Sequence, residues 1–217
     1  MRTLRLMLGR AALLGVLAVW VTHCAPCPDT HRVPVKLFND AAVSKAVLNS
    51  AAGDAAWILK SACVEVVWIP CLPVSRSNMS PCAAPFGALE LHMLPGPLTT
   101  DFHGDTMGIA MPHLDVGDRA AVFVSRVRAT AARYPELVGV GDVMGCVIAH
   151  EIGHLLLHSN SHSGEGIMRA DFRQSDLIKG VQRQLVFTPA ERETIQSNLL
   201  DRGTVPNVSS RRHQFDP

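Results

Sequence analysis

The sequence is poor in aromatic and charged residues. Of its 217 residues, 5% are aromatic and 18% are charged, and the formal net charge is +1. A nearly neutral chain lacks the basic surface that binds phosphate backbones, so we expect no nucleic-acid partner. Because 47% of the residues are hydrophobic, the chain can still form the core of one globular domain.

Long apolar runs are also missing. The longest, at 11–21, is shorter than the roughly 20 residues that a membrane-spanning helix needs. Arg2, Arg5 and Arg10 precede it, which is the layout of a secretory signal peptide. We therefore predict a signal peptide at 1–25, a secreted or periplasmic protein and no stable membrane insertion, with a signal anchor as the alternative. Loss of three arginines and no acid would change the charge from +1 to −2.

Cysteine is scarce, with six residues in the chain. In an exported protein cysteines are first interpreted as disulfide partners. Cys71 and Cys82 flank a loop rich in proline and serine, so they form the first predicted pair, and Cys27 with Cys63 forms the second. We expect Cys146 to be a free thiol buried on a helix.

The pattern of apolar residues predicts alternating strands and helices. Period-two alternation and β-branched residues indicate strands at 33–39, 63–71, 88–94, 107–112 and 119–124. Helical spacing indicates helices at 40–61, 125–134, 143–158 and 188–203. Asp40, Asp142 and Thr188 are the expected N-caps, Pro189 the first residue of the last helix and Gly203 its end. A polar connection is expected after Met168.

The predicted helix at 143–158 carries an unusual set of polar residues. His150 and His154 are four residues apart, so both imidazoles project from one helix face and can reach one metal ion at about 2.0–2.1 Å. Glu151 lies next to the first histidine and can address a water at that ion. This HExxH pattern predicts a catalytic zinc site. The alternative is an amphipathic helix whose polar stripe faces water.

A catalytic zinc site of this kind needs a third protein ligand, and several residues compete for that place. His158 lies two turns beyond His150, about 12 Å along the helix axis, which is too far for one tetrahedral ion. Asn160 tolerates the left-handed conformation, so the chain can turn back there and bring His162 beneath the metal. We predict His162 as the third ligand. The alternatives are His158 and the glutamates Glu165, Glu191 and Glu193.

The segments "HEIGHLLLHSNSH" and "GIM" resemble the metzincin clan of zinc metallopeptidases, in particular a secreted bacterial branch. The clan motif is HExxHxxGxxH followed by a turn that contains methionine. The resemblance implies that His150 and His154 are ligands, Glu151 is the catalytic acid and base, and Met168 lies under the metal. This sequence departs from the motif, because Leu157 replaces the glycine, Asn160 stands at the third histidine position, and His162 follows two residues later.

The resemblance also implies a fold and a function. The fold is α+β and zincin-like or metzincin-like, with a twisted mixed β-sheet packed on the HExxH helix, a methionine-containing turn and a C-terminal helix. The domain would span 33–203, after a short segment at 26–32 and before a flexible tail at 204–217.

The function implied is that of a secreted metalloendopeptidase, with one catalytic Zn²⁺ and a protein or peptide as substrate. Glu151 would act as general base and then acid on a water that the zinc activates. An extended substrate would pair with the strand that contains "AVFV". The alternative is a zinc-binding or interaction module of the same fold without turnover.

Overall fold

The computed structural model describes residues 27, 29–71, 82, 87–99, 104–112 and 117–203. The predicted signal peptide, the C-terminal tail and most of the loop after Cys71 lie outside the described residues. The elements follow one another as β1 (His31–Phe38), α1 (Lys45–Lys60), β2 (Val64–Cys71), β3 (Leu89–Leu94), β4 (Gly108–Met111), β5 (Arg119–Phe123), α2 (Val124–Ala132), α3 (Val140–Leu157), α4 (Gln174–Val181) and α5 (Pro189–Gly203). The five predicted strands are all present, within two residues of the expected bounds.

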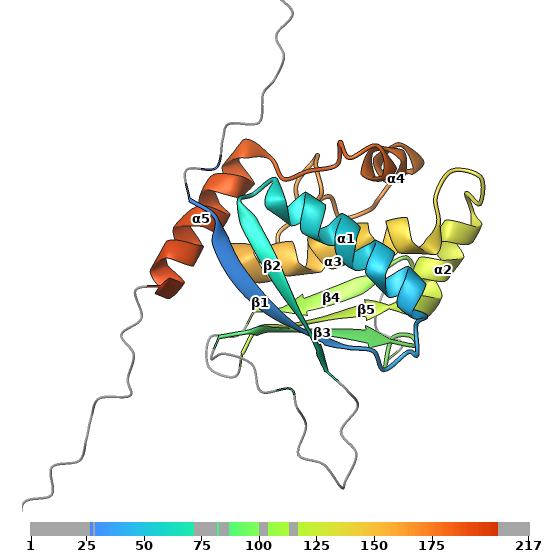
Figure 1. Cartoon of the computed structure of the whole chain (residues 1–217). Coiled ribbons are helices and arrows are strands. Elements are labelled where there is room, and N and C mark those ends of the chain that lie inside the picture. Colours follow the sequence, from blue (N-terminus) through green and yellow to red (C-terminus); the bar gives the residue numbers. More distant parts are fainter. Residues whose placement is uncertain are drawn as a thin grey trace, which may run out of the picture.

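The strands form one mixed sheet in the order β2-β1-β3-β5-β4. Strands β2, β1, β3 and β5 run parallel, and β4 pairs antiparallel with β5 at one edge. Strand β3 alternates as expected, with Leu89, Leu91 and Met93 buried. Helices α1 and α3 lie together on one face of the sheet (Figure 1). The protein is therefore an α+β fold with a mixed sheet, as predicted.

The position of β5 corrects one expectation. The strand that contains "AVFV" lies between β3 and β4, so its backbone hydrogen bonds are already used. An added substrate strand needs an unpaired edge. Of the described strands, β4 and not β5 forms the edge at this end of the sheet. The sequence could not show this, because the edge depends on how distant segments pair.

The predicted start of the first helix is wrong. Helix α1 begins at Lys45 with Ser44 as N-cap, rather than after Asp40. The Asn39 side chain bonds to Val43 through both its oxygen and its nitrogen, at 2.8 and 2.9 Å, which holds a loop instead of a helical turn. Ala42 takes a left-handed φ of 48°, which ends any regular helix there. The Asp40 carboxylate pairs with His92 at 3.1 Å.

Helix α4 was missed, since a polar connection was expected after Met168. It is only two turns long, which is too short for its apolar residues to show a helical repeat in the sequence. Leu177 and Asp176 are buried, and the Asp176 carboxylate accepts a hydrogen bond from the Arg173 backbone at 3.0 Å. Gly180 approaches the Cys146 sulfur on α3 so closely that a Cβ atom would stand 2.6 Å away. The local cap by Asp176 and the packing on α3 both support this helix.

Helix α3 forms the centre of the core. It begins at Val140, three residues earlier than expected, and Asp142 lies in its first turn, where the carboxylate accepts from the Gly139 N–H at 2.7 Å. The helix is apolar and long enough to cross a membrane, but 78% of that 18-residue window is buried inside the protein. It is therefore the core helix of a globular domain. Gly145 lets α1 approach so closely that a Cβ atom would stand 3.0 Å from the Ala51 carbonyl.

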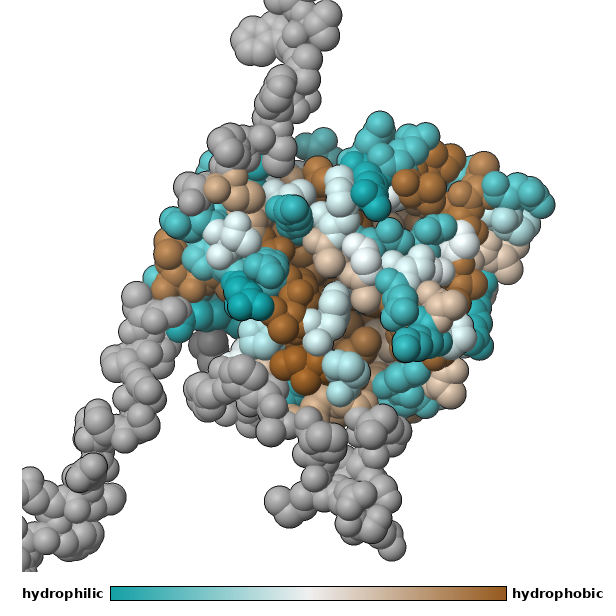
Figure 2. Space-filling view, viewed as in Figure 1, coloured by the Kyte–Doolittle hydropathy of each residue, from teal (hydrophilic) through white to brown (hydrophobic). Residues whose placement is uncertain are grey.

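Two disulfides hold the ends of β2. Cys27 is bonded to Cys63, just before the strand, and Cys71 at its end is bonded to Cys82. Cys146 is free and buried. The three cysteine predictions are thus confirmed. Apolar residues gather over β2 near the middle of the face in Figure 2, which agrees with the half-buried side chains at 66–69 of this edge strand.

Candidate metal centre

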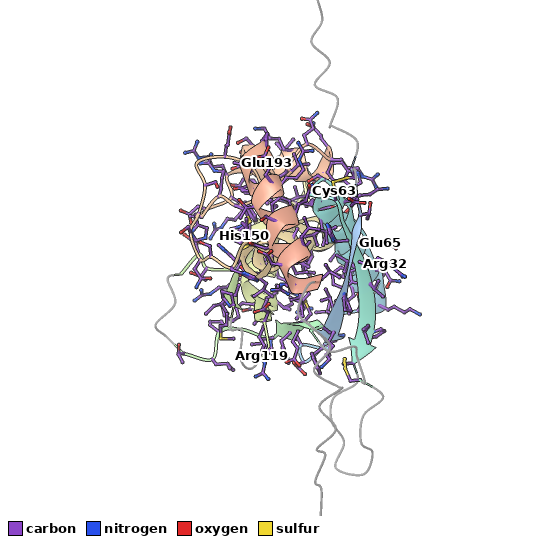
Figure 3. All side chains as sticks on the ribbon, turned by 90° about the vertical axis from the view of Figure 1, so that its left-hand side faces the viewer. Arg32, Cys63, Glu65, Arg119, His150 and Glu193 are labelled. Atoms are coloured by element: carbon purple, nitrogen blue, oxygen red, sulfur yellow. A yellow bond between two sulfur atoms is a disulfide. The ribbon has the colours of Figure 1, made fainter. Side chains whose placement is uncertain are left out.

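The polar residues of the HExxH pattern lie inside the protein. His150, Glu151 and His154 are 7%, 5% and 4% exposed, which excludes the alternative of a stripe that faces water. Figure 3 shows His150 among the ribbons near the centre of the view and Arg119 at its lower rim. Three titratable groups on about one turn of a core helix are costly unless they have partners. Their partners decide what the site can do.

Backbone carbonyls orient the two helix histidines. His150 Nδ1 lies 2.8 Å from the Ile167 oxygen, and His154 Nδ1 lies 2.7 Å from the Ser159 oxygen. A carbonyl oxygen only accepts, so each Nδ1 must carry the hydrogen and each Nε2 must present a lone pair. Burial lowers the pKa of His150 to about 3 and also lowers the pKa of His154, which favours the neutral rings.

The two Nε2 atoms stand 3.0 Å apart. In the neutral tautomers that the carbonyls select, two lone pairs face each other with no hydrogen between them, which is unfavourable. A shared cation removes this conflict. Two ligands at about 2.0–2.1 Å in a tetrahedral zinc site are separated by roughly 3.3 Å, close to the spacing in this structure. The pair therefore fits a metal ion.

The chain turns back after α3 and brings a third histidine to this pair. His158 ends the helix in the left-handed conformation, with φ 50°. The turn was expected at Asn160, and that expectation is wrong: the Ser159 N–H bonds back to the His154 carbonyl at 3.2 Å, and the reversal begins two residues earlier, at His158. His162 then lies with its ring centroid 5.3 Å from that of His150 and 4.9 Å from that of His154.

One ligand atom from each of His150, His154 and His162 lies within 4.8 Å of the others. His162 is exposed, whereas the other two are buried, so the cluster opens to solvent on one side. Three imidazoles and an open side are the composition of a catalytic zinc site, which keeps one position for water or substrate. The donor set therefore fits zinc.

The alternative third ligands lie elsewhere. His158 Nε2 bonds to Arg202 at 2.8 Å, and the carboxylate of Glu191 accepts hydrogen bonds from Ser163 and Thr188. Glu165 and Glu193 are exposed. Within the described residues, the group of potential ligands that converges contains His162 and none of these four.

The Glu151 side chain lies between its own helix, α3, and the edge strand β4. A Cβ atom on Gly108 of β4 would stand 2.5 Å from the Glu151 carboxylate, so only glycine allows this approach. Burial raises the pKa of Glu151 to about 8. A carboxyl with a pKa in this range can take up and release a proton near neutral pH, and a nearby cation would favour its ionised form.

Met168 packs against the same helix. It is fully buried, and a Cβ atom on Gly153 would stand 2.5 Å from its sulfur and 2.9 Å from Cε1 of Phe187. Gly153 immediately precedes His154, so Met168 and Phe187 support the helix backbone next to a predicted ligand. The carbonyl of the residue before Met168 is the one that orients His150.

Several residues of the site were missed by the sequence analysis. The carbonyls of Ser159 and Ile167 carry no sequence signal, because every residue has one. Phe172 meets the His150 ring edge-on at 5.6 Å, and one aromatic in a polar connection does not reveal such a contact. Gly108 in "MGIAMP" was a detectable signal, since glycine inside a strand often marks a close approach.

Comparisons with known proteins are sparse. No family model matches the sequence, and no curated protein matches it. Among solved structures, archaemetzincin from Methanopyrus kandleri is similar at 17% identity and a TM-score of 0.49, over 81% of this chain and 99% of that one. Metalloproteinase-II from Bacteroides fragilis is similar at 13% identity and a TM-score of 0.48, over 80% of this chain and 55% of that one.

Proposed function

We propose that the protein is a zinc-dependent metalloendopeptidase. The observation that carries the proposal is the way the two buried histidines are held. Backbone carbonyls hold both Nδ1 atoms, and the Nε2 lone pairs meet beside His162 and next to a buried glutamate. Export to the periplasm or the medium is part of the proposal, because two disulfides suit an oxidising compartment.

His150, His154 and His162 would hold one zinc ion. When bound, zinc would supply Lewis acidity, which polarises a peptide carbonyl and makes a water acidic. The Glu151 carboxylate would accept the proton of the attacking water and then pass it to the leaving amine nitrogen. Its raised pKa favours the first transfer, because the conjugate base of a weaker acid accepts a proton more readily.

The substrate would be an extended peptide that adds to the sheet at β4. This strand pairs with β5 on one side, and its Gly108 lies against Glu151. A peptide laid along the other side of β4 would place a backbone carbonyl near the carboxylate by main-chain hydrogen bonds alone. The site would then act on protein or peptide chains rather than on small esters.

The test compares metal content and peptide hydrolysis in four purified proteins. Wild type should hold about one zinc per chain and cleave an unfolded protein substrate. Glu151→Gln should retain the zinc and lose hydrolysis by a factor of about 10² or more, because the proton acceptor is removed. His162→Ala should lose zinc affinity, whereas the matched variant His158→Ala should keep it.

The outcomes separate the candidates. Zinc in wild type without cleavage of any substrate would favour the zinc-binding module without turnover. Retained hydrolysis in Glu151→Gln would refute the role of that residue. Wild type without stoichiometric metal after purification and dialysis against zinc would contradict the whole proposal.

A further inference from the structure

The loop that carries His162 is tied to the first turn of α5. The Ser163 hydroxyl donates a hydrogen bond to Oε1 of Glu191. The second oxygen of the same carboxylate accepts from the Thr188 N–H at 2.8 Å, and the Glu191 N–H donates to the Thr188 hydroxyl at 3.3 Å. Glu191 is only 9% exposed. A capping box thus uses one carboxylate oxygen for the helix and the other for the loop.

His162 depends on its backbone for its position. Unlike His150 and His154, it makes no ring-nitrogen hydrogen bond to another residue of the described chain. Two hydrogen bonds hold the next residue, Ser163. Its N–H donates to the Met168 carbonyl at 2.8 Å, and its hydroxyl donates to Glu191. The place of the His162 ring therefore follows from where Ser163 is anchored.

The opposite end of α5 holds the end of α3. Asn198 donates to the Leu156 carbonyl at 2.8 Å, and Arg202 donates to the Leu155 carbonyl at 3.3 Å. These carbonyls belong to the last turn of the helix that carries the first two histidines. Helix α5 thus contacts the two-ligand helix near one end and the third-ligand loop at the other. Figure 3 shows α5 from the front, with the exposed Glu193 on it.

We propose that Glu191 is a positioning residue for His162 and acts through Ser163. The inference rests on the proposed metal centre. The carboxylate does not touch the ion or the substrate; it sets the distance between the third imidazole and the other two. Groups that orient the ligands of a metal typically change metal affinity 10–100-fold when they are removed, and we expect an effect of this order here because Glu191 sets the position of the loop that carries His162.

The experiment measures zinc affinity by competition with a chromophoric chelator and records the visible spectrum of the cobalt-substituted protein. Glu191→Ala and Ser163→Ala should each weaken zinc binding about 10–100-fold. Their cobalt spectra should shift from that of wild type toward that of His162→Ala, because band position and intensity report the number and geometry of the ligands. The double variant should lose no more than the stronger single variant.

Two control variants separate positioning from helix stability and from charge. Thr188→Ala removes the hydroxyl cap of α5 but leaves the bond between Ser163 and Glu191. Glu193→Gln removes an exposed carboxylate two residues along the same helix. Both should bind zinc and cobalt as wild type does.

Either of two results would overturn the inference: zinc affinity and cobalt spectra of Glu191→Ala and Ser163→Ala that equal those of wild type, or a Thr188→Ala variant that loses as much affinity as they do. If wild type itself binds no metal, the proposed function fails first and this inference fails with it. If Glu191→Ala does not fold, Ser163→Ala alone decides, since it leaves the helix cap intact.

Discussion

Gly153 and Gly53 offer a test of how tightly the helix is supported beside the predicted ligands. Gly153 lies inside α3, and Gly53 lies inside α1. A Cβ atom at Gly53 meets nothing within 4 Å, whereas at Gly153 it would stand 2.5 Å from the Met168 sulfur and 2.9 Å from the Phe187 ring. The same substitution, Gly→Ala, should therefore change stability in opposite directions at the two positions.

The magnitudes follow from two opposing terms. Alanine is preferred over glycine in a helix interior by about 0.5–1 kcal/mol, and Gly53→Ala should gain that amount. Gly153→Ala gains the same preference but forces a methyl group onto two buried side chains. Met168 is fully buried and Phe187 is 6% exposed, so neither can move into solvent. Overpacking of this kind costs about 1–3 kcal/mol, which leaves a net loss of up to about 2.5 kcal/mol.

The assay is equilibrium unfolding in urea, with a chelator present so that bound metal adds nothing to the stability of any variant. The midpoint should rise for Gly53→Ala and fall for Gly153→Ala at an unchanged slope. Zinc affinity of Gly153→Ala should also fall, since the displaced backbone belongs to the residue before His154. A Gly153→Ala variant as stable as Gly53→Ala would refute the close packing of Met168 and Phe187 under the helix.

Two further predictions concern groups outside the predicted ligands. Arg202→Ala should destabilise the protein by about 2–4 kcal/mol, because it leaves the buried carboxylate of Asp118, whose Oδ1 has no hydrogen-bond partner among the described residues, without its cation. Arg32→Ala, which breaks the exposed pair with Glu65, should change the free energy of unfolding by about 0.5 kcal/mol or less. Burial, more than the nearby charges of Asp54 and Asp142, raises the pKa of the Cys146 thiol to about 12. The folded protein at pH 8 should therefore leave Cys146 unmodified by iodoacetamide while denatured protein is alkylated, as peptide mass spectrometry would show; rapid labelling of the native state would contradict its burial.

Features that depend on a few neighbouring residues were predictable. The strands show in period-two alternation, and the start of α5 shows in Thr188 followed by Pro189 and, three residues after the cap, Glu191. Such signals reflect local backbone preferences and one-sided burial, which the order of residues expresses directly. The predicted start of α1 was wrong because the Asn39 side chain hydrogen-bonds to the Val43 backbone, which competes with a helical turn.

Features that depend on distant contacts were not predictable. Helix α4 is too short to be recognised from its apolar residues, and it packs closely against Cys146 of α3. That His158 and not Asn160 takes the left-handed conformation is decided by the surroundings of the helix end, where Arg202 from α5 bonds the His158 ring.

By itself, the order of residues determined that two histidines and a glutamate share one helix, since a spacing of four residues is also one turn. Only the tertiary structure decided that Nε2 atoms converge, that Glu151 is buried against Gly108, and that Glu191 anchors a loop rather than pointing at the cluster. The reason is physical: a tautomer, a pKa and a distance between rings depend on carbonyls and side chains far away along the chain, and these approach only when the domain closes around its core.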